Sequence, residues 1–281
     1  MFLMLDKDYT FITFNCLTAD LTELFHNGFN NGHGYLREPN SIRSAGALTA
    51  VAIQSLQNSQ FGGIAVAGFD FTLAEYVKKS WKKTLIKILK QYSFFSQKKV
   101  EPEKIQWNIC CYSDPSSHNR TDIGKQAVAE IVEHCDISSK DASKLYIIAA
   151  KEVAEETYQA MEALIHNLNS LHSRAANQVP FSSINFGMNT SPEGRLVIHS
   201  FLTATWNGLG NGETPIFPIS IFQIKKGINY DPEDPNYDLF KLAMKVSAKR
   251  LYPNFVSLDS SFNLPYYKPD DYRTFATSMG K

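Results

Sequence analysis

The spacing of apolar residues predicts helices through the first part of the chain. Two runs rich in apolar residues, 2–5 and 10–14, come first and are typical of strands. After them, apolar residues recur every three or four positions in several stretches, which is the period of an amphipathic helix. We therefore predict helices over residues 17–29, 42–57, 72–92, 122–134 and 141–171.

Two short stretches beside these helices carry mainly glycine and amide residues. Residues 28–34 hold glycines separated by asparagines and predict a loop with positive φ angles, a region that glycine enters without steric cost. Side-chain amides also gather at the end of the helix over 42–57. They fit either the rim of a polar pocket or ordinary polar capping of a helix end, and they are Gln54, Gln57, Asn58 and Gln60.

The predicted helix over residues 72–92 is basic on one face. Its lysines oppose an apolar stripe that includes Trp81, Leu85 and Ile88. Such a face either meets anionic lipid or nucleotide phosphate, or is an ordinary solvated surface. The lysines are Lys78, Lys79, Lys82, Lys83, Lys87 and Lys90. Residues 93–107, which follow, are polar and predict a linker.

Residues 141–171 form the strongest predicted helix. Apolar side chains recur from Leu145 to Leu171 at steps of three and four. At 1.5 Å per residue the helix would be roughly 40–45 Å long, which is more than a small domain needs. A helix of this length favours packing against a partner helix, in this chain or in another subunit.

The pattern changes after residue 175 to strands that alternate with helices. Strands are predicted over 179–186, 216–224 and 255–258, and helices over 193–205 and 238–251. Strands separated by helices indicate an α/β sheet or barrel with crossover connections. We expect a helical bundle over about residues 40–175 and the α/β strands and helices over about 176–281, within one domain that spans residues 1–281.

Charge and composition exclude several classes of protein. The 281 residues include 28 Lys and Arg against 28 Asp and Glu, so the formal net charge is zero. A balanced charge argues against a nucleic-acid-binding protein and against a polybasic membrane anchor. The hydrophobic share of 43% is typical of a soluble globular protein and too high for a disordered chain.

Three further absences in the sequence indicate a cytoplasmic protein. No apolar stretch approaches the roughly 18–20 residues of a membrane span. Residues 1–6 lack the basic region and long apolar core of a signal peptide. Four cysteines in a chain of this length do not form the disulfide framework of a secreted protein.

The cysteines suggest two kinds of chemistry. Cys110, Cys111, His118 and Cys135 invite a zinc site, but their spacing matches no paired-ligand pattern and favours small buried side chains instead. Cys16 follows a strand-like run and precedes a glycine-rich loop, where either a reactive thiol or a structural cysteine fits.

A second glycine-rich loop, residues 207–215, leads into a predicted buried strand. Glycines at 208, 210 and 212 let its backbone approach another group closely, and the loop matches neither a Walker motif nor a dinucleotide fingerprint. Loops at strand ends of α/β proteins often carry ligand sites.

Several motifs together resemble the anaerobic, glycyl-radical ribonucleoside-triphosphate reductases. They occur in that family's order over nearly the whole chain, which makes them more specific than any single motif. They are GYLREPNSI at 34–42, ETYQAMEALIHNLN at 156–169, QVPFSSINFG at 178–187, TSPEGR at 190–195 and GLGNGETPIFP at 208–218.

This resemblance implies a fold and a reaction. The family has a ten-stranded α/β barrel, works as a homodimer and reduces the ribose 2′-OH of ribonucleoside triphosphates, usually with formate. A separate radical-SAM iron–sulfur activase installs a glycyl radical, which generates a thiyl radical on an active-site cysteine. A second cysteine supplies a hydrogen to the 2′ position, and deoxynucleotides or ATP act as effectors.

The resemblance also implies roles for particular residues. Cys16 matches the hydrogen-donating cysteine. The strand run with Ser182, Ser183 and Asn185 matches the strand that meets substrate, and Asn211 with Glu213 matches part of the pocket wall. The basic and long helices resemble the dimer bundle near which effectors bind, which would turn Lys78 and Lys82 toward phosphate.

The sequence departs from the family at several points. Met279-Gly280 is followed by Lys281 where the family has its thiyl cysteine, and we expect the glycyl-radical segment and the zinc site to belong to a C-terminal half that this sequence lacks. We also expect the family's N-terminal ATP-binding cone to lie outside this sequence. Leu5-Asp6 and Phe61 replace histidine-containing positions.

Two hypotheses follow from these departures. The first is the N-terminal half of the reductase barrel, inactive alone and with no metal or other cofactor of its own. The alternative is a non-catalytic nucleotide-binding or dimerisation module, or the remnant of a split enzyme. Because half a barrel exposes strand edges, we expect the chain to associate.

Overall fold

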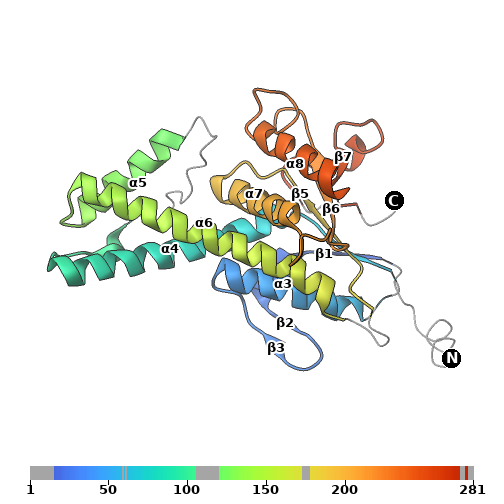
Figure 1. Cartoon of the computed structure of the whole chain (residues 1–281), viewed down its shortest axis with the longest axis horizontal. Coiled ribbons are helices and arrows are strands. Elements are labelled where there is room, and N and C mark those ends of the chain that lie inside the picture. The colour runs from blue at the N-terminus through green and yellow to red at the C-terminus, as the bar shows by residue number, and fades with distance from the viewer. Residues whose placement is uncertain are drawn as a thin grey trace.

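Five parallel strands form the central sheet, which lies beside a group of long helices (Figure 1). The computed structural model describes residues 16–58, 60, 62–105, 120–172, 178–272 and 276–277. Within these residues the strand order is β1–β4–β5–β6–β7. The strands are β1 (Leu17–Ala19), β4 (Ile64–Val66), β5 (Ser182–Phe186), β6 (Ile219–Ile224) and β7 (Asn254–Ser257). The predicted α/β class is confirmed, and a ten-stranded barrel stays a prediction.

Helices occupy most of the chain between these strands. A short antiparallel hairpin, β2 (Phe29–Asn30) with β3 (Tyr35–Leu36), separates the first two helices. The helices are α2 (Leu21–Asn27), α3 (Ile42–Gln57), α4 (Phe69–Ser96), α5 (Arg120–His134), α6 (Ser139–Ser170), α7 (Pro192–Asn207) and α8 (Tyr237–Arg250). Single 3₁₀ turns lie at Pro102–Lys104 and Leu264–Tyr266.

The sheet has one apolar face and one polar face, because side chains alternate along each strand. Ile184 and Phe186 belong to the hydrophobic core, and Phe186 meets Phe201 of α7 with ring centroids 5.1 Å apart. Ser183 and Asn185, which alternate with them along the strand, point to the opposite face. We call this opposite side the polar face of the sheet.

Side-chain caps set where several helices begin. Ser41 and Ser44 form a reciprocal capping box at the start of α3, and the Asp20 carboxylate accepts the Thr22 N–H at 2.9 Å at the start of α2. The Ser191 hydroxyl accepts the Gly194 N–H at 3.1 Å before α7. Each cap satisfies a backbone donor that the first helical turn leaves unpaired.

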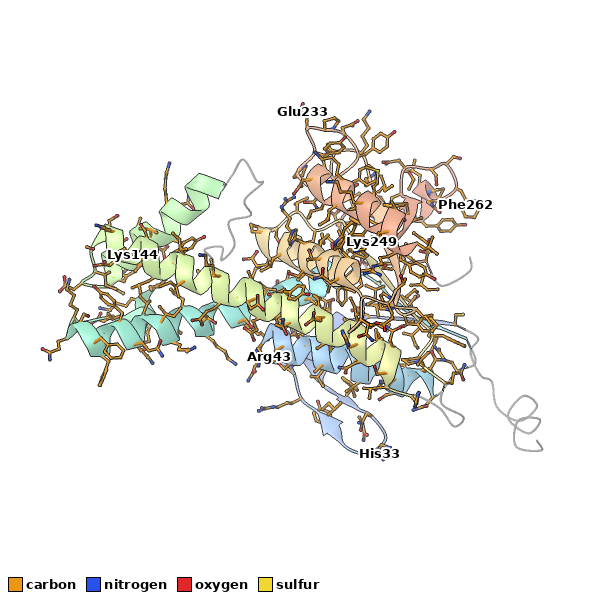
Figure 2. All side chains as sticks on the ribbon, in the orientation of Figure 1. His33, Arg43, Lys144, Glu233, Lys249 and Phe262 are labelled. Carbon is orange, nitrogen blue, oxygen red and sulfur yellow. The ribbon has the colours of Figure 1, made fainter. Side chains whose placement is uncertain are left out.

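Helices α4 and α6 lie side by side and extend to the left of the sheet in Figure 1, with α5 beside the far part of α6. Trp81 of α4 meets Tyr146 of α6 edge to face, with centroids 5.5 Å apart. Lys144, on the projecting part of α6, is far from Glu233 and Phe262 in the loops after β6 and β7 (Figure 2). The two longest predicted helices therefore pair within one chain.

Helix α3 crosses α6 at a glycine. A Cβ at Gly46 would lie 3.1 Å from the Ala160 carbonyl oxygen, so glycine permits a close approach of the two helices here. Ala45, Ala50 and Ala160 are buried at or near this crossing. The small residues predicted to lie in an interior therefore allow helix–helix contact.

Most predicted elements are confirmed, with corrections at their ends. The helix predicted over 17–29 is wrong at Leu17–Ala19, which pairs with β4 as strand β1, and Asp20 then caps α2. The predicted loop over 28–34 includes one strand of the hairpin, with positive φ at Gly28 and Gly32. The helix predicted over 72–92 is longer at both ends, and its last turn replaces the predicted linker at 93–96.

Several predictions fall outside the described residues. They concern the strand-like runs at 2–5 and 10–14, Leu5, Asp6, Phe61, Cys110, Cys111, His118, Met279 and Gly280. Among the helices that the structure describes, none is both long enough and apolar enough to cross a membrane.

Candidate functional site

The polar face of the sheet gathers the predicted strand residues Ser183 and Asn185. Both are fully buried. The chain after β7 returns over this face and brings Thr277 against Asn185. This part of the chain, residues 264–272 and 276–277, is called the covering segment below.

Asn185 bonds to both the covering segment and the neighbouring strand. Its Oδ1 accepts the Thr277 N–H at 3.0 Å and the Thr277 hydroxyl at 3.1 Å. Its Nδ2 donates to the Thr277 carbonyl at 3.0 Å and to the Val66 carbonyl of β4 at 3.1 Å. The Ser183 hydroxyl lies 3.5 Å from the same Thr277 carbonyl, which is a weak contact.

Cys16 lies immediately before β1 and is exposed. Leu17 pairs in register with Ile64, which pairs with Ser182, and the Leu17 N–H donates to the Gly63 carbonyl at 3.3 Å. Alternation from Leu17 places Cys16 on the polar face, at the amino edge of the sheet. Asn185 follows Ser182 by three residues, so it lies about 10 Å farther along the strands than the level shared by Leu17, Ile64 and Ser182.

Ser182 lies on the other side of β5 from Ser183. Its hydroxyl donates to the Pro180 carbonyl at 3.3 Å, and it alternates with Ile184 of the core. The structure therefore brings Ser183 and Asn185 together on one face and leaves Ser182 on the helix-covered face.

Asn211 and Glu213 are both exposed in the loop before β6, at the amino edge of the sheet. The Glu213 carboxylate accepts the Asn211 N–H and side-chain N–H, each at 2.9 Å. These bonds from Asn211 hold the pKa of Glu213 below its ordinary value. The carboxylate is thus kept ionised, and the pair is self-contained on the surface.

Arg250, which the sequence did not single out, fixes the shape of this loop. Its guanidinium donates to the carbonyls of Trp206 (2.6 Å), Asn207 (2.9 Å) and Gly212 (2.7 Å), and the side chain is almost fully buried. Gly208 has φ +80°, and a Cβ there would collide with the loop backbone. Glycine at position 208 therefore allows the backbone to turn and allows the Arg250 side chain to pack against it.

Asn169 of α6 holds the other end of the loop. Its Oδ1 accepts the Ile216 N–H at 2.8 Å and the Phe217 N–H at 3.1 Å, and its Nδ2 donates to the Phe217 carbonyl. Asn169 ends the motif at 156–169, so its side chain explains part of that motif. The signal in the sequence was a polar residue near the end of an apolar stripe.

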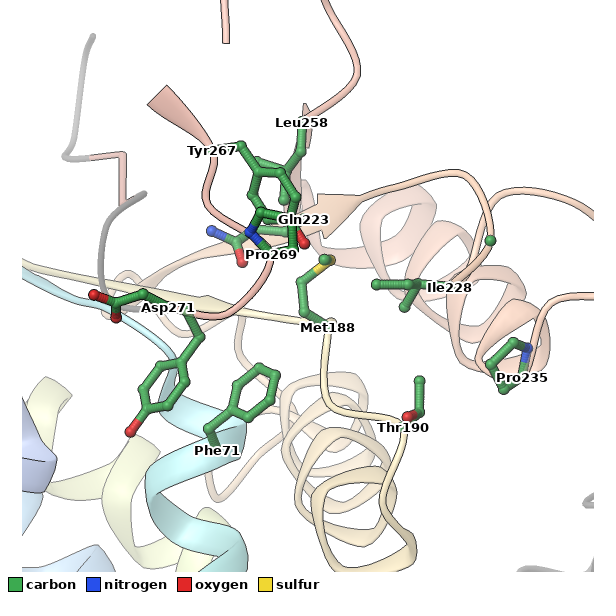
Figure 3. Close-up of a pocket in the computed structure, with 12 residues that line it drawn as sticks. Phe71, Met188, Thr190, Gln223, Ile228, Pro235, Leu258, Tyr267, Pro269 and Asp271 are labelled. Atoms are coloured by element: carbon green, nitrogen blue, oxygen red, sulfur yellow. The ribbon is translucent and has the colours of Figure 1, made fainter. Parts of the chain in front are cut away.

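A cavity of about 360 Å³ lies at the opposite, carboxyl edge of the strands (Figure 3). The loop after β5 and the chain after β7 form much of its wall, and Phe71 and Tyr272 stack with ring centroids 4.5 Å apart. Its wall is mainly apolar and aromatic. Lining residues include Phe71, Met188, Gln223, Tyr267, Pro269 and Tyr272.

Asp70, at the start of α4, anchors the loop that forms one wall of this cavity. Its Oδ2 accepts the N–H groups of Gly187 at 3.0 Å and Asn189 at 2.9 Å. Its Oδ1 has no hydrogen-bond partner among the described residues. Burial raises the pKa of Asp70 above its ordinary value, and the two backbone N–H groups oppose that rise.

Two buried asparagines hold the same loop against the chain after β6. Asn229 donates to the carbonyls of Gly187 (3.0 Å) and Gln223 (2.9 Å), and Asn236 donates to the Asn189 carbonyl (3.0 Å). The Asn236 Oδ1 in turn accepts from Arg195 at 2.8 Å. Such a connected polar network makes the carboxyl edge rigid.

The basic face of α4 carries ion pairs. Lys78 lies 3.4 Å from Glu75, and Lys87 lies 3.5 Å from Glu152 of α6. Lys79 is bonded to Glu38. Lys82 is exposed. Acidic neighbours therefore offset part of this face, and the predicted effector role of Lys78 and Lys82 stays a prediction.

Gln60 belongs to the group of amide side chains near the end of α3, and Cys135 to the cysteines that invite a zinc site. Gln60 is buried, and neither atom of its amide has a partner among the described residues. Cys135 is buried as well, and burial raises the pKa of its thiol. Across the described residues, no three His, Cys, Asp or Glu side chains cluster to hold a metal ion.

Comparisons with known proteins agree with the motifs. A family model described as anaerobic ribonucleoside-triphosphate reductase matches residues 2–280. Proteins named anaerobic ribonucleoside-triphosphate reductase from Haemophilus influenzae and Escherichia coli are each 30% identical over 257 residues, which is 90% of this chain and 29% of theirs. The protein of that name from Enterobacteria phage T4 is 27% identical over 244 residues, 86% of this chain and 32% of its own. The chain thus spans about three tenths of these relatives' length.

Proposed function

The chain belongs to the anaerobic ribonucleoside-triphosphate reductase family, and from this membership we propose that it forms the part of a reductase that donates hydrogen to the ribose. The observation that carries the proposal is the family match over residues 2–280. Cys16 lies on the polar face two residues before Thr18, which shares its register with Ser183 two strands away. The thiyl cysteine, the glycyl radical and the zinc site are assigned to the part of the relatives' length outside the match.

The proposed substrate is a ribonucleoside triphosphate whose ribose faces the polar face. Once a hydrogen atom has been removed from C3′, the 2′-hydroxyl would leave as water with the proton of the 3′-hydroxyl. Cys16 would then give a hydrogen atom to the radical at C2′, and the thiyl radical left on Cys16 would be reduced at the expense of formate. The exposed position of Cys16 at the amino edge supports this role, because a donor thiol must be open to its substrate. The covering segment would keep water away from the rest of the face.

The remaining partners follow from the same membership. Formate is the proposed reductant, a radical-SAM iron–sulfur protein the activase, and deoxynucleotides or ATP the effectors. A second copy of the chain is the proposed dimer partner, and the cytoplasm the proposed compartment. Asn211 and Glu213 remain proposed pocket residues. They would contact the substrate in the assembled reductase, at the amino edge of the sheet.

An anaerobic turnover assay tests this proposal. The purified chain is combined with activase, formate and a ribonucleoside triphosphate, with and without a polypeptide that supplies the rest of the relatives' length. Deoxynucleotide should form only in the combined sample and should disappear with Cys16→Ser. Product from the chain alone, or product from Cys16→Ser at the wild-type rate, would overturn the proposal.

A second candidate function is a non-catalytic nucleotide-binding or dimerisation module. It is favoured by the projecting arm of α4, α5 and α6, which exposes Val132, Ile147 and Ile148 together with the basic face of α4. Calorimetric titration with deoxynucleoside triphosphates, with sedimentation of the same sample, tests it. Binding and dimer formation that survive Cys16→Ser but weaken when Lys78 and Lys82 become alanine would support this module, and absence of both would exclude it.

A further inference from the structure

The covering segment is seated on the sheet by two anchors, of which Tyr272 is the first. Its ring stacks on Phe71 with an interplanar angle of 2°, and its hydroxyl lies 2.9 Å from the Thr22 hydroxyl. Gly68, with φ +52°, lies beneath the ring, and a Cβ there would overlap it. Tyr272 therefore lies against the start of α4.

Asn185 is the second anchor, and its contacts are of a different kind. It meets the N–H, the hydroxyl and the carbonyl of a single residue, Thr277. An amide side chain that pairs with both backbone groups of one residue fixes that residue as a neighbouring strand would. Shifting the segment by one residue would break all three bonds and turn the side chains over.

The hydrogen-bonding capacity of Asn185 is fully used by these contacts. A carboxamide has two N–H donors and an oxygen with two lone pairs. The donors go to Val66 and Thr277, and the lone pairs accept from the N–H and the hydroxyl of Thr277. Because Asn185 is also fully buried, no group of it is left for a ligand.

We propose that Asn185 is a positioning residue that sets the register of the covering segment on the polar face of the sheet. Its link to the Val66 carbonyl ties that register to β4, the strand beside β1 and Cys16. A molecule bound at this face would therefore meet the backbone around Thr277, and Asn185 would act only through it. The catalytic consequence rests on the proposed function, whereas the placement itself does not.

Hydrogen exchange read by mass spectrometry tests the placement without any ligand. Asn185→Asp keeps the size of the side chain but turns an oxygen toward the Val66 and Thr277 carbonyls. Exchange of peptides covering residues 264–272 and 276–277 should rise roughly tenfold or more, since the two hydrogen bonds that Nδ2 donates are lost and replaced by repulsion between oxygens. Amides of β4, β5 and β6 should stay protected.

Thr18→Ala is the matched control, because Thr18 is exposed on the same face, two strands away. It should leave exchange in residues 264–277 unchanged. Asn185→Ala, which removes every bond without repulsion, should raise exchange in the same peptides. Unchanged exchange there in both Asn185 variants would overturn the proposal, and so would equal loss of protection in the sheet, which would give Asn185 a general structural role.

A second readout separates this proposal from the proposed function. The rate at which iodoacetamide alkylates Cys16 is measured with and without a ribonucleoside triphosphate. Loss of nucleotide protection in Asn185→Asp, with normal exchange in residues 264–277, would make Asn185 a substrate contact and overturn the positioning role. Altered exchange with no nucleotide effect in any form, wild type included, would support the positioning role while the proposed function failed.

Discussion

Asp70 shows how a single residue couples the start of a helix to a loop beyond the sheet. Its carboxyl group is almost fully buried, and one oxygen accepts two backbone N–H groups while the other has no described partner. Burial penalises the charged form more than the two N–H groups favour it, so the pKa is raised. The protonation state of Asp70 is therefore linked to folding.

The first prediction concerns this linkage. A carboxyl whose pKa is raised in the folded state contributes stability that is complete below its ordinary value of 3.8 and is lost as pH rises through the raised value. The free energy of unfolding of the wild type, minus that of Asp70→Asn, should fall as pH rises above 3.8 and through the raised pKa. Urea denaturation at a series of pH values measures this difference. A difference that is constant or grows with pH would contradict the assignment.

The second prediction concerns Arg250. Its planar fork reaches several carbonyls at once, which the single ammonium of lysine cannot do. Arg250→Lys should lower the free energy of unfolding by about 2 kcal/mol, the effect of losing hydrogen bonds to a buried charge. Lys245→Ala, at an exposed position of the same helix, is the control and should cost less. Equal losses from the two variants would show that the loop does not depend on the guanidinium.

At the scale of elements, the close crossing of α3 and α6 depends on Gly46. A valine there would press its branches against the Ala160 carbonyl in a buried contact. Gly46→Val should therefore cost about 1–3 kcal/mol. Gly34→Val, where nothing lies within 4 Å of the added Cβ, should be nearly neutral. Thermal unfolding measures the stability of both variants. Similar losses of stability would mean that replacing a glycine, and not the close contact with Ala160, causes the effect.

The long helices could be predicted from the sequence because their apolar spacing is sustained over many turns. The helix predicted over 141–171 differs from α6 (Ser139–Ser170) by two residues or fewer at either end. Strand β1 could not, because three residues are too few to show alternation and Leu17 fits the spacing of the helix after it. The extension of α4 was missed because Ser93 and Ser96 are polar and weak in helix propensity.

The site could be predicted only where its arrangement depends on residues that are close together in sequence. Alternation along β5 places Ser183 and Asn185 on one face, and this follows from sequence alone. Asp70 and Arg250 were missed because their partners lie far along the chain; Asp70 binds Gly187, 117 residues later. Nothing in the spacing around either residue indicates such a contact.

At the scale of the whole molecule, the sheet has two open edges among the described residues. Strands β1 and β7 each pair on one side only, with β4 and with β6. Edge strands with free N–H and C=O groups invite pairing with another chain. We predict that the purified chain associates as concentration rises, which sedimentation velocity would detect. A monodisperse monomer over a wide concentration range would contradict this.

The proposed function requires that the polar face of the sheet near Cys16 bind a ribonucleoside triphosphate. The most direct test is the rate of Cys16 alkylation by iodoacetamide under anaerobic conditions, followed by mass spectrometry of the peptide that contains it. A millimolar ribonucleoside triphosphate should slow this reaction several-fold, while alkylation of the cysteine in a Lys144→Cys variant, at an exposed position on the projecting part of α6, should be unaffected. An unchanged rate at Cys16, or equal slowing at both positions, would contradict the claim.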